Sequence, residues 1–85
     1  PRLPALKPIQ VERILLKNGF QTKRQTGSHR IFYNQETGKL VVVPFHGKDI
    51  PRGTLRSIIK QSDLPQEFFV KVAPYRLLGD IKSTQ

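Results

Sequence analysis

The sequence predicts a small α+β domain in which a helix, a three-stranded antiparallel meander and a second helix follow one another within 85 residues. Three observations predict this order. Apolar residues recur at helical spacing near residues 8–18 and again after residue 51. Three runs between these segments are rich in β-branched and aromatic residues. The turns that join the runs are short, which favours antiparallel pairing with helices covering one face of the sheet.

The first helix is predicted over residues 8–18. Pro8 suits the first helical turn, where a missing N–H is not needed, and a stripe of apolar residues follows at helical spacing. Gly19 then accepts the positive φ that ends many helices. Residues 1–7 are proline-rich and show no periodicity, so we expect them to form a loose N-terminal arm.

Three strands are predicted at residues 20–25, 29–34 and 39–44. The first is polar, which is typical of an edge strand. Gly27 and Ser28 favour a turn between the first two strands, because glycine accepts positive φ and serine bonds to nearby backbone. A second glycine-containing loop joins the other two strands, so a meander is expected.

The second strand presents different chemistry on its two faces. Side-chain alternation places His29, Ile31 and Tyr33 on one face and Arg30 and Phe32 on the other. Both faces have apolar members, so alternation alone does not decide which one is buried.

The second helix is predicted from Pro51 to Ser62, with an apolar stripe toward the sheet. A short helical turn near residues 64–70 is expected to close the core. We therefore divide the chain into the arm at 1–7, a folded domain at 8–69 and a C-terminal tail at 70–85, to which the sequence assigns no role. Three basic residues share the exposed face of the second helix at four-residue spacing: Arg52, Arg56 and Lys60.

The charge distribution indicates a polyanionic partner. The formal net charge is +9, and residues 1–62 hold twelve Lys and Arg against three acidic residues. Such a surface attracts nucleic acid by releasing counterions, although a merely solvated basic surface is the alternative. The chain has no cysteine, no apolar run of membrane-spanning length and no signal-peptide core. We expect a cytoplasmic protein with no membrane association and no cofactor.

Residues 24–33 carry the candidate active site. His29 stands where a loop becomes a strand, which leaves an imidazole exposed but well oriented. Histidine changes charge near working pH and suits proton transfer. The alternative is that His29 is partly buried on the side of Ile31 and Tyr33. His46, in a later loop, is a candidate second proton-transfer group, although bonding to local backbone is the simpler expectation.

If the polyanion is RNA, its cleavage without a metal needs proton transfer and cations that hold the phosphate, a task for which guanidinium groups are well shaped. Two histidines separated by a strand pair, without paired carboxylates, do not predict a metal site. Tyr33 and Phe45 are able to stack on bases, but core packing is the simpler expectation for both. The candidate RNA-binding residues are Arg24, Ser28, Arg30, Lys48, Arg52, Arg56 and Lys60.

Four motifs occur together and in order: Asn18-Gly-Phe20, Gly27-Ser-His29, Val43-Pro-Phe-His46-Gly and Ile50-Pro-Arg-Gly-Thr-Leu-Arg-Ser-Ile-Ile-Lys60. With these motifs the chain resembles the HicA (YcfA-like) toxin family over about residues 8–69. The resemblance implies a double-stranded-RNA-binding-domain-like fold, an mRNA-cleaving (mRNA interferase) activity and neutralisation by a HicB-type antitoxin.

The family's catalytic histidine falls on His29. The first hypothesis is therefore a metal-independent endoribonuclease toxin that cleaves mRNA and inhibits translation. The alternative is a non-catalytic RNA-binding module of the same fold, in which His29 only contacts RNA or packs. A third hypothesis is an interaction protein whose basic surface binds an acidic partner.

Overall fold

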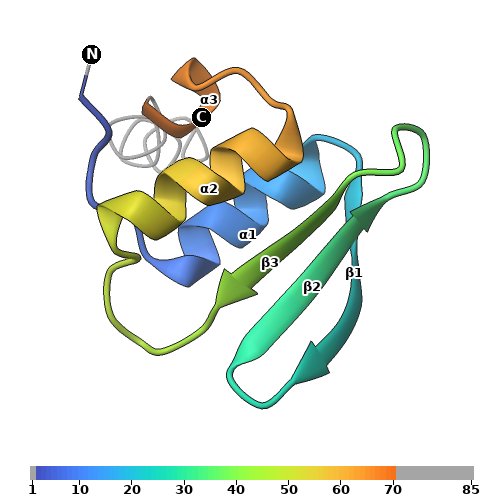
Figure 1. Cartoon of the computed structure of the whole chain (residues 1–85), viewed down its shortest axis with the longest axis horizontal. Helices are drawn as coiled ribbons and strands as arrows, with labels where there is room; N and C mark the ends of the chain where they lie inside the picture. The colour runs from blue at the N-terminus through green and yellow to red at the C-terminus, as the bar shows by residue number, and fades with distance from the viewer. Residues whose placement is uncertain (1, 71–85) are drawn as a thin grey trace, which may run out of the picture.

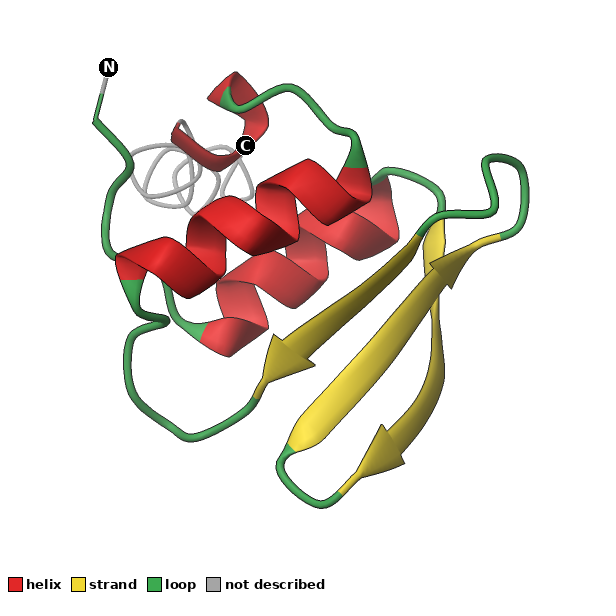
Figure 2. Cartoon of the chain, in the orientation of Figure 1, coloured by secondary structure: helices red, strands yellow, loops and turns green. Residues whose placement is uncertain are grey.

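The structure, a computed structural model, describes residues 2–70 as a helical layer on a three-stranded sheet (Figure 1). Helix α1 contacts β1 and β3, and α2 contacts β3 (Figure 2). The α+β fold class and the double-stranded-RNA-binding-domain-like order of elements are confirmed. The elements are α1 (Pro8–Lys17), β1 (Phe20–Thr26), β2 (His29–Asn34), β3 (Leu40–Pro44), α2 (Arg52–Ser62) and α3 (Glu67–Val70).

The sheet has the order β1-β2-β3, and both neighbouring pairs are antiparallel. The polar first strand is at an edge, as its composition predicts. The observed strand ends differ from the predicted ones by a single residue: β1 extends to Thr26 and β3 begins at Leu40. Such shifts are usual where strands fray into turns.

Burial decides which face of the sheet the helices cover. Phe32, Val41 and Val43 are fully buried. On β3, Leu40 and Val42 alternate with the two buried valines and are exposed. Because side chains alternate along a strand, the helices cover the Phe32 face. The opposite face, which carries His29, is therefore open.

Residues 2–7 are not the loose arm that their composition suggests. Leu6 is fully buried and Leu3 retains only 5% exposure. The backbone N–H of Ile50 donates to the carbonyl oxygen of Leu6 at 2.8 Å. A segment without periodicity can still be held when two large apolar side chains reach the core, since each contributes about 1.5–3 kcal/mol of burial.

The junction between α1 and the sheet is built from asparagines. The Asn18 side chain donates from Nδ2 to a carbonyl of the last helical turn at 2.7 Å, and Gly19 follows with φ of +92°. Asn34 is buried, and its Oδ1 accepts the backbone N–H groups of Glu36 and Thr37. These bonds fix both the helix end and the β2–β3 hairpin.

The end of the described chain closes the core. Asp63 terminates α2 with φ of 61°, and the fully buried Phe69 of α3 joins the hydrophobic cluster. Of the predicted tail at 70–85, residues 71–85 lie outside the described residues. Within residues 2–70, the helices are too short or too polar to cross a bilayer.

Candidate active site

His29 is the first residue of β2 and is exposed. It follows a tight turn in which Gly27 adopts φ of +57°, in the left-handed region that glycine accepts without a steric penalty. The strand directs His29 to the same face as Ile31 and Tyr33, the open face of the sheet. The imidazole is therefore accessible. The backbone of His29 is held by pairing on both sides, with Thr26 and Pro44.

Pairing between β2 and β3 brings a second histidine to the first. His29 is the register partner of Pro44, and the backbone N–H of Phe45 donates to the carbonyl oxygen of Ser28 one step further. This bond extends the pairing of the two segments by one step beyond the end of β3. His46 consequently lies beside His29, with ring centroids 5.8 Å apart and ring planes at 86°.

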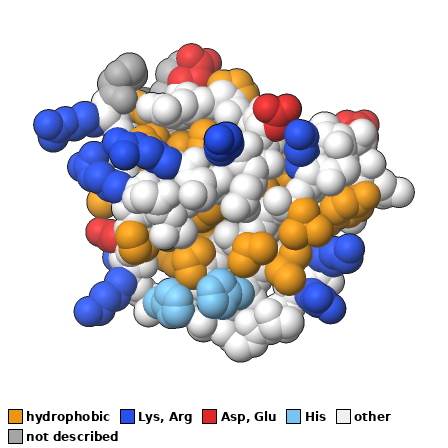
Figure 3. Space-filling model, viewed as in Figure 1, with side chains coloured by type: hydrophobic (Ala, Val, Ile, Leu, Met, Phe, Trp, Pro, Cys, Tyr) orange, Lys and Arg blue, Asp and Glu red, His pale blue; other side chains and the backbone are white. Residues whose placement is uncertain are grey.

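The two histidines form one exposed group at the end of the sheet where β2 begins and β3 ends. The space-filling view shows their side chains next to each other, with apolar side chains beside them (Figure 3). The sequence pointed to each histidine separately but contained no signal that would place them together. The hydrogen bond between Ser28 and Phe45 is a tertiary feature.

Arg30 projects to the helix-covered face. Its Nη1 donates to Oε2 of Glu12 at 2.8 Å, its Nε donates to Oε1 of Gln25 at 3.1 Å, and its guanidinium lies 4.1 Å from the ring centre of Phe45. The guanidinium is thus held by three neighbours. Arg30 stays a predicted RNA contact, but its observed contacts join β2 to α1 and to the loop after β3.

Two cations of β1 lie on the open face. Arg24 is the register partner of Ile31, so its side chain shares the face of His29. An irregularity in the β1–β2 register falls between Thr22 and Arg24. The Lys23 ammonium there lies 5.0 Å from the ring centre of Tyr33. Lys23 is not among the residues predicted from the sequence, and alternation in a regular strand would give it the opposite face from Arg24.

The remaining predicted RNA contacts are exposed. Lys48 lies in the loop before α2. Basic side chains follow α2 on the same side of the molecule that shows the two histidines (Figure 3). A polyanion that crosses this side meets both groups. The exposed basic residues of α2 are Arg52, Arg56 and Lys60.

The two aromatic candidates differ in environment. Phe45 is partly buried and packs against the core, as expected. Tyr33 is half-buried on the open face rather than in the core, and Lys23 covers its ring. Within residues 2–70, no group of three or more His, Cys, Asp or Glu side chains is placed to hold a metal ion.

A comparison with known protein families identifies the family to which the chain belongs. The family described as "HicA toxin of bacterial toxin-antitoxin" matches residues 10–64, more than half of the chain. The chain belongs to the HicA toxin family. No curated protein matches it at a significant level.

Membership of the HicA family confirms the resemblance read from the four motifs. HicA proteins are toxins of toxin–antitoxin systems and are, in general terms, nucleases. A toxin role, an antitoxin partner and an RNA substrate follow at this level of detail. The matched residues include both histidines and all of α2 up to Ser62.

Proposed function

We propose that this HicA-family chain is an endoribonuclease toxin that cleaves mRNA without a metal ion, with His29 and His46 in proton transfer. The observation that carries the proposal is the 5.8 Å separation of two exposed imidazole rings. A phosphodiester placed against both rings has a proton acceptor and a proton donor within reach. Its substrate, mRNA, assigns the chain to the cytoplasm.

The proposed reaction uses the RNA's own nucleophile. A neutral imidazole takes the proton of the 2′-hydroxyl, the 2′-oxygen attacks phosphorus, and the bond from phosphorus to the 5′-oxygen breaks. A protonated imidazole supplies the proton that the leaving 5′-oxygen needs. The products are a 2′,3′-cyclic phosphate and a 5′-hydroxyl end.

We assign the base to His29, because pairing with both neighbouring strands holds its backbone. His46 lies in the loop after β3 and is assigned the acid. Cations stabilise the charge that develops on the phosphate oxygens. Arg24 shares the open face with His29, and Lys48 follows His46 by two residues, so these two are the proposed phosphate contacts closest to the reaction.

The test is cleavage of a long single-stranded RNA in EDTA by the purified parent, His29→Ala, His46→Ala and the control Gln35→Ala. Gln35 is exposed in the hairpin at the other end of the sheet. We expect the parent and the control to cut, leaving cyclic phosphate ends. Loss of an acid or base costs about 100-fold or more in rate, so both histidine variants should be strongly impaired.

RNA binding is measured on the same four proteins. Binding retained by the histidine variants with cutting lost supports the catalytic assignment. Binding by all four with no cutting by the parent, also in a translation extract, would favour the non-catalytic RNA-binding module.

We further propose that the antitoxin partner is of the HicB type and covers the histidine pair or the basic side of the molecule. The charge of +9 favours an acidic partner. High yield of the chain alone from an actively translating host, with no growth arrest, would argue against this proposal.

A further inference from the structure

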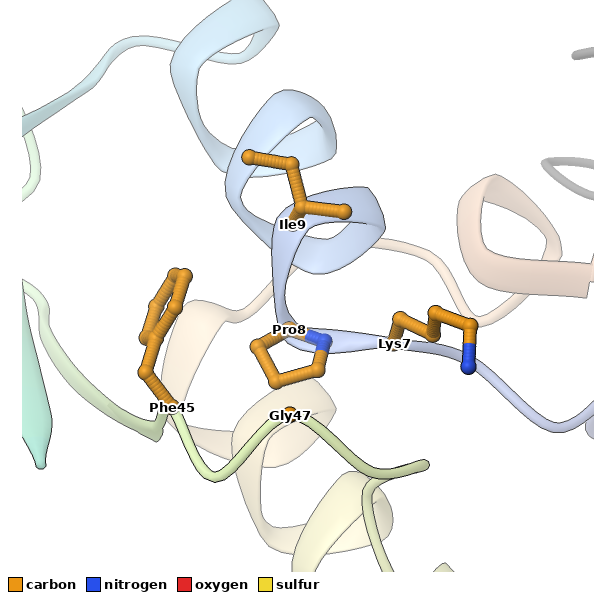
Figure 4. Close-up of a pocket in the computed structure, with 5 residues that line it drawn as sticks. All are labelled: Lys7, Pro8, Ile9, Phe45 and Gly47. Atoms are coloured by element: carbon orange, nitrogen blue, oxygen red, sulfur yellow. The ribbon is translucent and has the colours of Figure 1, made fainter.

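A small hollow lies next to the loop that carries His46. It has a volume of about 210 Å³ and is lined by Lys7, Pro8 and Ile9 from the start of α1 and by Phe45 and Gly47 from the loop after β3 (Figure 4). Phe45 and Gly47 are the two chain neighbours of His46. The hollow therefore adjoins the site proposed for cleavage.

The walls of the hollow are mainly apolar and include one aromatic ring. Phe45 stands across from Pro8, with Ile9 above them (Figure 4). The guanidinium of Arg30 lies over the Phe45 ring at 4.1 Å, and the ring packs against the core. Pro8 is buried, and Ile9 remains 45% exposed. The ring is thus held in place while an apolar surface beside it stays open to solvent.

The charged side chain in the lining is already engaged. Lys7 Nζ lies 3.3 Å from Oδ1 of Asp49, and both side chains are more than half exposed. The lining therefore offers a ligand mainly shape and apolar surface. Its volume is below the range of about 300–1,000 Å³ usual for sites that hold drug-sized ligands, so one planar ring system is a suitable occupant.

We propose that this hollow, lined by Phe45, Pro8 and Ile9, holds one nucleobase of the RNA next to the bond that is cut. The inference rests on the proposed RNA cleavage, and it adds the residues that select the base at one position. Proteins recognise single-stranded RNA through its unstacked bases, which lie against aromatic side chains of the protein. A base held beside Phe45 places its own phosphate near His46, which follows Phe45 in the chain.

The proposal assigns base selection mainly to size and stacking. Apolar walls distinguish a one-ring from a two-ring base by fit, and they do not read hydrogen-bonding edges. The parent should therefore distinguish purine from pyrimidine at one position by about 10-fold, with little discrimination within either class.

The first test measures binding, so it does not depend on cleavage. A 2′-O-methyl RNA oligonucleotide, which has no free 2′-hydroxyl, carries a single abasic site moved along its length, and affinity is measured by fluorescence anisotropy. For the parent, one abasic position should lower the affinity about 10-fold or more, as expected for loss of a stacked base. For Phe45→Leu, which keeps an apolar side chain, the same abasic site should have little further effect.

A matched pair of variants on α1 provides a second test in case Phe45→Leu does not fold. Ile9 and Leu16 are exposed to 45% and 46%, but only Ile9 lines the hollow. Ile9→Ala should reduce the abasic effect and the purine–pyrimidine preference, whereas Leu16→Ala should leave both as in the parent.

The outcomes separate the two proposals. If RNA is cut but no abasic position matters for the parent, or Ile9→Ala behaves as Leu16→Ala does, the base site is overturned and the nuclease proposal stands. If one abasic position matters and Phe45→Leu removes the effect while the parent never cuts, the base site stands and cleavage is overturned.

Discussion

Arg30 Nη1 lies 2.8 Å from Oε2 of Glu12 and joins the central strand to the first helix. The carboxylate is largely enclosed, with 12% of the side chain exposed. The same guanidinium lies over the ring of Phe45, the residue before His46. One arginine thus links α1, the strand that begins at His29 and the loop that carries His46.

The Arg30–Glu12 pair predicts a specific pattern of stabilities. Arg30→Ala should lower the free energy of unfolding by about 1–3 kcal/mol, because it leaves an enclosed carboxylate without its partner. Adding Glu12→Gln should recover part of that loss, since a neutral amide tolerates the site better. Urea denaturation of the parent, both single variants and the double variant measures the coupling. Strictly additive effects would contradict a direct interaction.

Gly19 should be intolerant of any side chain. Its φ is +92°, and an added Cβ would lie 3.0 Å from Nδ2 of the buried Asn34. We expect Gly19→Ala to lower the free energy of unfolding by about 1–3 kcal/mol. Gly27 is the control, because it also has positive φ but has nothing within 4 Å of an added Cβ. Equal losses in the two variants, measured by thermal unfolding, would show that the contact with Asn34 is unimportant.

The basic row of α2 predicts the salt dependence of RNA binding. If Arg52, Arg56 and Lys60 each contact a phosphate, replacing all three by Gln should reduce the slope of log affinity against log salt by about 2. Lys39→Gln, in the β2–β3 hairpin loop, is the control for a simple loss of charge. A triple variant with the parent's slope would make the row an ordinary solvated face. Anisotropy titrations over a range of salt concentrations supply the slopes.

The proposed roles of the two histidines predict the pH profile of cleavage. The reaction needs one neutral and one protonated imidazole, so the parent's rate should pass through a maximum and fall on both the acid and the alkaline side. His46→Ala removes the proposed acid. Its rate should be about 100-fold lower than the parent's, and the fall in rate on the alkaline side should disappear. An unchanged bell shape in His46→Ala would exclude His46 as the acid. Rates are measured on a short RNA with one cut site.

Local patterns were sufficient for the secondary structure. The helix at Pro8–Lys17 and the strand at His29–Asn34 follow from spacing, from Gly19 and from the Gly27-Ser28 turn, all of which act within a few residues. The four motifs were also sufficient for the family, because they occur together and in order. His29 was selected from its position where a turn meets a strand, and its catalytic role stays a prediction.

Other features depended on residues far apart in the chain. The loose arm predicted at residues 1–7 was not found in the described part, because burial of Leu3 and Leu6 depends on the core that they meet. Alternation did not decide which face of β2 is buried. The burial of Phe32 beneath the helices decides it. The position of Lys23 on the open face depends on an irregular register, which cannot be read from one strand.

The sequence by itself determined the α+β order of elements, the basic character of the chain and its membership of the HicA family, since these rest on local spacing, composition and motifs. Only the tertiary structure decided that the His29 face is open, that His46 lies beside His29 and that a hollow lies next to the loop that carries His46. The physical reason is that each depends on pairing between β2 and β3 or on packing of α1 against the loop after β3. Such contacts join residues that no local pattern connects.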